Sequence, residues 1–214
     1  MAPAEAEQSK VASRPQDRGV ARRHAFLQAA REVFLEQGYE VASVNDVVRR
    51  AGGSLATLYA QFGNKEGLFL AVVQDQQERF HREIRPDSVD HLPLEEGLTA
   101  IGEHYLKALL TRDNLAFYRI VVSEGRNLPA LAQRQISLAV DKTAEVVSAY
   151  LEARAALETV HVKTSHAAGF FTGMVRARHH YLALSDPSYT LTDAELTEHV
   201  RACVQVFLSG AVAR

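Results

Sequence analysis

Apolar side chains recur at helical spacing along most of the chain. Between residues 20 and 37 they fall at every third or fourth position, and Gly38 follows as a C-terminal stop. No segment alternates between apolar and polar residues in the manner of a half-buried strand. The pattern therefore predicts an all-α fold.

Two short helices follow the first long one. Ser43 is suited to cap a helix of about two turns that ends before Gly52. Ser54 is suited to cap a second helix over 55–62, and a longer helix over 64–84 comes next. Two short helices joined by a glycine-containing turn have the dimensions of a helix-turn-helix, whose second helix can enter the major groove of DNA. Many helical proteins contain such pairs, so the geometry alone leaves the function open.

The second half of the chain is also helical. A segment with two prolines, 85–93, predicts a connection. Thr192 and Glu195 form a capping box that begins the last helix. The other predicted helical stretches are 94–110, 114–124, 129–157 as one helix or two, and 161–184.

Composition and charge exclude several classes of protein. The 214 residues are 47% hydrophobic, and no run of them reads as a signal peptide or a membrane span. The single cysteine, Cys203, cannot form an internal disulfide, which favours a reducing compartment. We therefore expect a cytoplasmic protein with no membrane partner.

Positive charge is concentrated near the N-terminus. The net charge is only −2, yet residues 10–31 hold six Lys or Arg and one Asp. Residues 1–17 contain few large apolar side chains, a composition that predicts a flexible basic arm. Such a charge run alone is better explained by a solvated arm and helix face.

The run SVNDVVRRAGGSLATLYAQFGNKEGLF, residues 43–69, makes the DNA-binding interpretation specific. It resembles the DNA-binding domain of the tetracycline-repressor (TetR) family, and the resemblance extends over about 18–73. The later run RIVVSEGRNLPALAQ resembles the AefR-like C-terminal type of that family. The resemblance implies a helix-turn-helix domain over 18–63, with the motif at about 43–62. A connecting helix and linker over 64–93 and an effector-binding and dimerisation domain over 94–214 would follow.

The resemblance also implies which residues contact DNA. They are Ser43, Val44, Gly53, Ser54, Leu55, Ala56, Thr57, Tyr59, Ala60, Gln61 and Lys65. Hydroxyl groups and the Lys65 ammonium can donate hydrogen bonds to phosphate beside the helix N-termini. Tyr59 can donate through its hydroxyl group, and Gln61 can pair with an adenine edge.

Two positions depart from the family pattern. Gly53 stands where an aliphatic packing residue is usual, and Ala60 stands where a larger side chain often contacts the DNA backbone. Both departures suggest a looser or differently distributed set of DNA contacts. For Ala60, a small exposed helix residue without a contact is the simpler interpretation.

The C-terminal half is implied to form a homodimer and to hold a small molecule. The apolar stripes on the last two helices favour a dimer interface that includes Phe170, Val204 and Phe207. The same types of residue also build ordinary cores, so each pocket candidate has that alternative. The candidates are Tyr105, Phe117, Tyr118, Phe170, Phe171, Met174 and Tyr181.

The resulting hypothesis is a ligand-responsive repressor that releases a palindromic operator in double-stranded DNA when an unidentified small molecule binds. We predict no cofactor, no catalytic residue and no metal site, since adjacent His179 and His180 point to different helix faces. Two alternatives remain. One is an all-α enzyme that uses a pocket histidine, although no catalytic motif is present, and the other is a helical adaptor with a degenerate helix-turn-helix.

Overall fold

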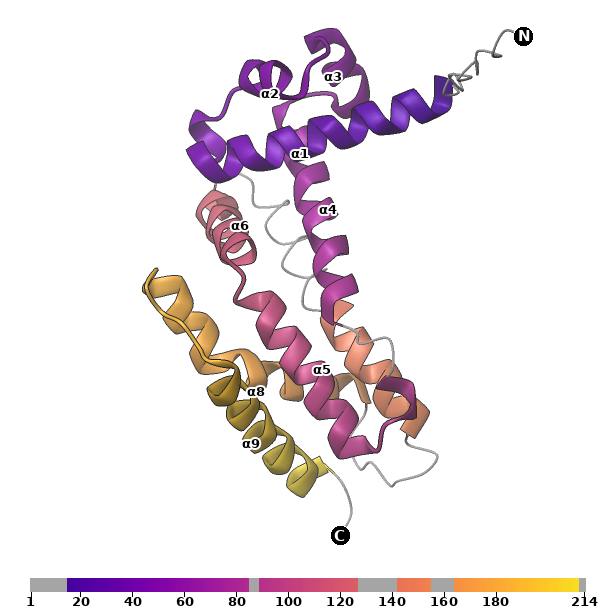
Figure 1. Ribbon diagram of the computed structural model, residues 1–214, viewed down its shortest axis with the longest axis vertical. Helices are drawn as coiled ribbons and strands as arrows, with labels where there is room; N and C mark the ends of the chain where they lie inside the picture. Colours follow the sequence, from indigo (N-terminus) through magenta and orange to yellow (C-terminus); the bar gives the residue numbers. More distant parts are fainter. Residues whose placement is uncertain (1–14, 85–88, 127–141, 155–163, 212–214) are drawn as a thin grey trace, which may run out of the picture. The chain divides into compact units, whose positions relative to one another are not determined.

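The computed structural model describes residues 15–84, 89–126, 142–154 and 164–211 (Figure 1). Within these ranges every regular element is a helix, which confirms the predicted all-α fold. Several predicted features lie partly outside the described residues. Outside the described residues lie residues 1–14 of the predicted arm and residues 85–88 of the predicted linker. The same is true of residues 129–141 and 155–157 of the helical stretch predicted at 129–157, and of residues 161–163 of the helix predicted at 161–184.

The first half of the chain folds into the four predicted helices, but the first begins earlier and ends later than the predicted 20–37 and includes residues 15–17 of the predicted arm. They are α1 (Pro15–Val41), α2 (Val44–Ala51), α3 (Leu55–Phe62) and α4 (Lys65–Ile84). The backbone leaves the helical conformation at Gly38, where φ is 75° and ψ is 173°, and one more turn follows to Val41. A glycine adopts such a positive φ without the steric cost of a side chain. α1 therefore changes direction at Gly38 and ends three residues later.

The helices of the second half also follow the predicted order. They are a short 3₁₀ turn η1 (Val89–His91), α5 (Leu94–Leu109), α6 (Arg112–Ser123), a second 3₁₀ turn η2 (Glu124–Arg126), a helical stretch at 142–154, α8 (Thr164–Ser185) and α9 (Asp193–Ala211). The capping box ahead of α9 is confirmed. Thr192 Oγ1 accepts from Glu195 N at 3.3 Å, and Thr192 N donates to Glu195 Oε2 at 2.9 Å.

The chain divides into two compact units, one ending at Val72 and the other beginning at Val73. In the first unit the Phe34 and Phe69 rings make an edge contact with centroids 5.1 Å apart. Phe69 belongs to the first part of α4, and it is buried together with Leu68 and Val72. The first unit therefore includes that part of α4 and extends beyond residue 63.

In the second unit, α5 packs against both α8 and α9. Gly102 of α5 permits this approach, because a Cβ there would lie only 2.7 Å from Val200 Cγ1 and 3.2 Å from Phe171 Cζ. Tyr150, in the stretch 142–154, donates through its hydroxyl group to the carbonyl groups of Leu92 and Pro93, each at 3.0 Å. No helix in the described ranges contains an apolar stretch of the length that a membrane span requires.

Candidate functional sites

α2 and α3 form the predicted helix-turn-helix, and serine side chains cap both helices. Ser43 Oγ accepts from Asn45 N at 3.2 Å, and Ser54 Oγ accepts from Thr57 N at 3.1 Å. The Ser54 and Thr57 hydroxyl groups also share a hydrogen bond of 2.9 Å. Each cap satisfies a backbone donor that the helix leaves unpaired, which fixes where each helix begins.

The turn between α2 and α3 is held by α1. Gly53 has a φ of +99°, and a Cβ at this position would lie 3.1 Å from Phe26 Cζ. Arg22 Nη1 donates to Ala51 O at 3.2 Å, so a cation caps the negative end of α2. The conformation and the close packing both require glycine at position 53, which explains why an aliphatic residue is missing there.

α3 has one buried face and one exposed polar face. Leu58 and Phe62 are buried, and Phe62 makes an edge contact with the Phe26 ring at 6.3 Å. On the outer face Thr57 is exposed and Tyr59 is 45% exposed, and the small Ala56 and Ala60 lie beside them. Leu55 is half-buried at the start of the helix. The outer face of α3 thus offers two hydroxyl groups and an aromatic ring.

Gln61 differs from its neighbours on α3. Its side chain is half-buried, and its Oε1 atom has no solvent contact and no hydrogen-bond partner. An oxygen in this position cannot accept a hydrogen bond from an adenine amino group unless the side chain turns outward. On α3, the Tyr59 side chain is therefore open to solvent, whereas the Gln61 side-chain oxygen is not.

Lys65 links the start of α4 to the end of α1. Its ammonium group donates to Glu40 O at 2.9 Å and lies 4.7 Å from the centre of the Tyr39 ring. One of its three donors is thus used inside the protein. Asn64 caps the same end of α4 by accepting from Gly67 N at 2.7 Å.

Sequence patterns alone did not single out the structural role of the arginines around this motif. Arg23 lies over the Phe62 ring at 4.7 Å. Arg50 donates to both carboxylate oxygens of Glu36, at 2.8 and 2.7 Å, and this guanidinium group lowers the pKa of Glu36. Only spatial proximity reveals these contacts, because the partners of Arg50 and Arg23 lie 14 and 39 positions away in the chain.

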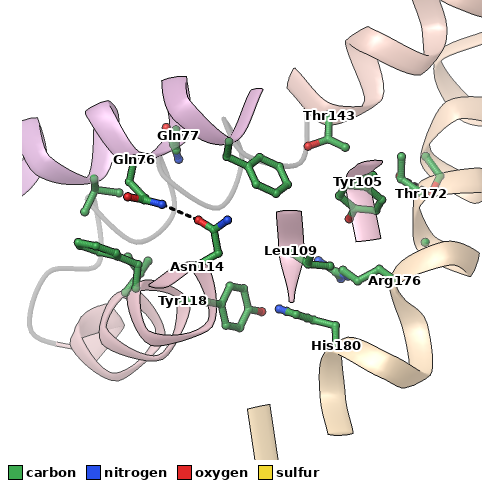
Figure 2. A pocket seen from close by; sticks show the side chains of 16 residues that line it. Gln76, Gln77, Tyr105, Leu109, Asn114, Tyr118, Thr143, Thr172, Arg176 and His180 are labelled. Atoms are coloured by element: carbon green, nitrogen blue, oxygen red, sulfur yellow. Dashed lines mark hydrogen bonds between the residues drawn. The ribbon is translucent and has the colours of Figure 1, made fainter. Parts of the chain in front are cut away.

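The second unit contains a cavity of about 280 Å³ (Figure 2). Its lining comes from the second part of α4, from α5 and α6, from the stretch 142–154 and from α8. Aromatic and aliphatic side chains dominate the walls, including Phe80, Leu109 and Phe117. A largely apolar cavity with a few polar groups has the character of a small-molecule site.

An amide pair marks one side of the cavity. Gln76 Nε2 donates to Asn114 Oδ1 at 2.7 Å (Figure 2), and Asn114 Nδ2 donates to Ala108 O at 2.6 Å. The Ala108 carbonyl belongs to the last turn of α5, whose end therefore fixes the Asn114 amide. The two amides are oriented before any ligand binds.

Arg176 and His180 mark the other side, one helical turn apart on α8. His180 is only 1% exposed, and burial, aided by the charges of Arg176 and Arg119, lowers its pKa to about 4. Burial raises the pKa of Tyr105 to about 12. At neutral pH both of these side chains are uncharged, and Arg176 is the one charged residue in the described lining.

Two family models match this chain. Residues 26–72 match the model for bacterial regulatory proteins of the tetR family, and residues 96–210 match the C-terminal domain of AefR-like transcriptional repressors. The second match alone covers more than half of the chain. The chain belongs to the TetR family.

Individual relatives agree with this assignment. The HTH-type transcriptional repressor ComR of Escherichia coli K12 is 47% identical over 58 residues, which are 27% of this chain and 28% of ComR. The chain matches only about a quarter to a third of the length of the first curated relatives. A TetR-family regulator from Mesorhizobium loti has the same fold, with a TM-score of 0.84 at 22% identity over 92% of this chain and 99% of its own. The flavonoid-responsive regulator FrrA has a TM-score of 0.76 at 28% identity, over 90% of this chain and 98% of FrrA.

The predicted effector residues of this TetR-family chain fall into three groups. Tyr105, Phe117 and Tyr118 line the cavity together. Phe171 and Met174 pack into or against the core of the second unit, and they do not line it. Exposed side chains make up the third group, which consists of Phe170 and Tyr181.

Five of the cavity residues that sequence reasoning missed share one stripe on α8. Gly169, Thr172, Gly173, Arg176 and His180 recur at spacings of three and four along α8, and all of them line the cavity. A stripe of small and polar residues along one side of a helix was the sequence signal that could have identified them.

The predicted dimer residues fall into a buried group and an exposed group. Val204 is fully buried, and the Phe207 ring contacts Phe171 at 5.4 Å, so both belong to the core of a single subunit. By contrast, Phe170 is 65% exposed on α8, and Val206 is 64% exposed on α9. Val204 and Val206 lie on nearly opposite sides of α9, because residues two positions apart on an α-helix are separated by about 200°.

Proposed function

We propose that this protein is a repressor that binds a palindromic operator as a homodimer and releases it when a small molecule occupies the cavity. The main support is the outer face of α3, where Thr57 and Tyr59 are exposed on a helix capped by Ser54. A rigid helix that presents a short polar face is suited to the major groove. Such a regulator acts where the chromosome lies, in the cytoplasm.

The DNA contacts in this proposal divide into two kinds. The N-terminal ends of α2 and α3, with Ser43 and Ser54, can hold phosphate groups and set the register of the protein. Tyr59 can then reach a base edge or pack its ring against a thymine methyl group. The basic N-terminal arm would add affinity of low sequence specificity.

Dimerisation is supported by apolar side chains that one subunit leaves exposed. Phe170 and Tyr181 on α8 and Val206 on α9 are all more than half exposed. Large apolar groups gathered on exposed faces are characteristic of protein interfaces. We propose that α8 and α9 pair with the same helices of a second copy, which gives the two-fold symmetry that a palindromic operator requires.

Control by a ligand is supported by the cavity and by one relative. The family relative FrrA is described as flavonoid-responsive. In the proposed mechanism the ligand favours a dimer whose two α3 helices are wrongly spaced for successive major grooves. Linkage then requires DNA and ligand to weaken the binding of each other. We propose no catalytic role and no cofactor for this cavity.

Recovery of genomic DNA on the purified full-length protein, followed by sequencing, tests the DNA-binding proposal. We expect an enriched site with two-fold symmetry, and we expect Tyr59→Ala to lose that enrichment while Gln205→Ala, on an exposed part of α9, retains it. A reporter promoter that carries the site should fall in activity when the protein is expressed. Absence of any enriched site would favour the adaptor or the enzyme, and a rise in reporter activity would make the protein an activator.

A further inference from the structure

The cavity of the second unit has an unbalanced positive charge. Arg176 is the only charged residue among its described lining residues, and no carboxylate belongs to that lining. Arg176 forms no hydrogen bond and no ion pair with any described residue. A guanidinium group in a partly closed apolar space is stabilised strongly by an anion, because the low dielectric strengthens the attraction.

His180 is a second unsatisfied group in the same cavity. It is 1% exposed, and neither ring nitrogen has a hydrogen-bond partner. Its pKa of about 4 keeps the ring neutral at pH 7, so one nitrogen can donate and the other can accept. Buried polar groups in proteins are nearly always paired, and a lone one in a cavity wall indicates a missing partner.

Aromatic and aliphatic groups separate these residues from the amide pair. Figure 2 shows Gln76 and Asn114 on one side and Arg176 and His180 on the other, with Tyr118 and Leu109 between them. The Tyr118 ring makes an edge contact with the His180 ring at 4.8 Å. A flat apolar body fits between the two polar ends, since offset and edge arrangements of aromatic rings are favourable.

We propose that the cavity binds a small aromatic acid, with its carboxylate on Arg176, its ring beside Tyr118 and a polar group at its far end on Gln76 or Asn114. This inference rests on the proposed role of the cavity as the effector site. The His180 ring donates a further hydrogen bond to the carboxylate. Arginine suits this role because its planar fork can donate two parallel hydrogen bonds to one carboxylate.

The same features argue against other ligand classes. A cation would meet Arg176 without any carboxylate in the described lining. A nucleotide carries several negative charges, whereas the lining supplies one positive charge within about 280 Å³. That volume is slightly below the range of about 300–1,000 Å³ that is usual for ligand pockets, which favours a small molecule with one charge.

Calorimetric titration of the full-length protein without DNA tests this proposal. The compounds are 4-hydroxycinnamate and its neutral isostere 4-hydroxycinnamamide. We expect the carboxylate to bind at least about 10-fold more tightly, as is typical when a hydrogen bond gains a charged partner. In Arg176→Gln the ratio of the two affinities should fall to about one, because only the carboxylate loses its ion pair.

Arg178→Gln is the matched control, because Arg178 is an exposed arginine on the same helix and does not line the cavity. Its affinity ratio should equal that of the unmodified protein. Equal affinity of the unmodified protein for both compounds overturns the proposal, as does the absence of binding at millimolar concentration. The comparison of the two compounds needs no variant, so it stands even if Arg176→Gln does not fold. The titration contains no DNA, so a failure to bind the aromatic acid can be distinguished from a failure of the protein to bind an operator.

Discussion

Tyr59 and Gln61 lie on the same helix but offer different groups to a DNA duplex. Tyr59 is 45% exposed, whereas the Gln61 Oε1 atom has no solvent contact. We expect Tyr59→Ala to weaken binding to the cognate operator by about 1–3 kcal/mol and Gln61→Ala to weaken it less. Fluorescence anisotropy with operator and scrambled DNA measures both effects. A larger loss for Gln61→Ala would show that its amide turns outward on binding and reads a base.

Lys65 combines a contact inside the protein with the predicted phosphate contact. Loss of its hydrogen bond to Glu40 O should lower the stability of the first unit by about 1 kcal/mol in Lys65→Ala. Loss of one phosphate contact should lower the salt slope of DNA binding by about one unit per subunit. Thermal melting and anisotropy over a salt series separate the two roles. An unchanged melting temperature contradicts the first role, and an unchanged slope contradicts the second.

His180 should make the stability of the second unit depend on pH. The folded state holds its pKa at about 4, and the ordinary value is 6.5. Between these values the unfolded chain binds the proton more readily, so the free energy of unfolding should decrease as the pH falls from 6.5 toward 4. Urea denaturation at pH 7 and pH 5 should show a smaller decrease for His180→Gln than for the unmodified protein. The other histidines are common to both chains, so equal decreases would mean that His180 is not held neutral.

At the scale of elements, α5 depends on a close approach at Gly97. A Cβ there would lie 1.9 Å from Tyr150 Oη, and this hydroxyl group is fixed by its bonds to Leu92 O and Pro93 O. We expect Gly97→Ala to destabilise the protein by about 1–3 kcal/mol through overpacking. Gly210→Ala in α9 is the control, because no atom lies within 4 Å of a Cβ there and alanine favours a helix. Melting temperatures compare the two variants, and a neutral Gly97→Ala would show that the stretch 142–154 can shift freely.

Contacts between helices also fix the caps and turns of the first unit. α1 supplies Phe26 and Arg22 to the turn between α2 and α3. The same helix supplies Glu36 to Arg50 at the end of α2. The orientation of α3 is therefore determined by α1 as much as by the turn that precedes α3, which explains how an eight-residue helix can present a fixed surface.

At the scale of the whole molecule, the two faces of α8 and α9 separate folding from dimerisation. Phe170→Glu and Val206→Glu place charges on exposed faces, so we expect folded monomers in which the proposed interface is broken. Val204→Glu places a charge in the core of the subunit, so we expect unfolded or insoluble protein. Sedimentation velocity with circular dichroism distinguishes these outcomes. Folded dimers in both surface variants would exclude this face as the interface.

The sequence by itself determined the elements and the family. Helical periodicity, the serines before α2 and α3 and the Thr192 and Glu195 pair are local signals, because they depend on residues at most a few positions apart. The contiguous segment SLATLYAQFGNKEGLF is also a local signal, and it identified the DNA-binding domain of the TetR family.

Only the tertiary structure decided which face of each helix is exposed and which groups remain unpaired. An apolar stripe looks the same in sequence whether it covers a subunit core, a cavity or a partner, so Phe170 and Phe171 could not be told apart until α5, α8 and α9 were packed together. The same is true of Arg176 and His180. That they lack partners among the described residues becomes visible only in the tertiary structure, where helices far apart in the sequence surround one cavity. Pairing depends on distance in space and not on distance along the chain.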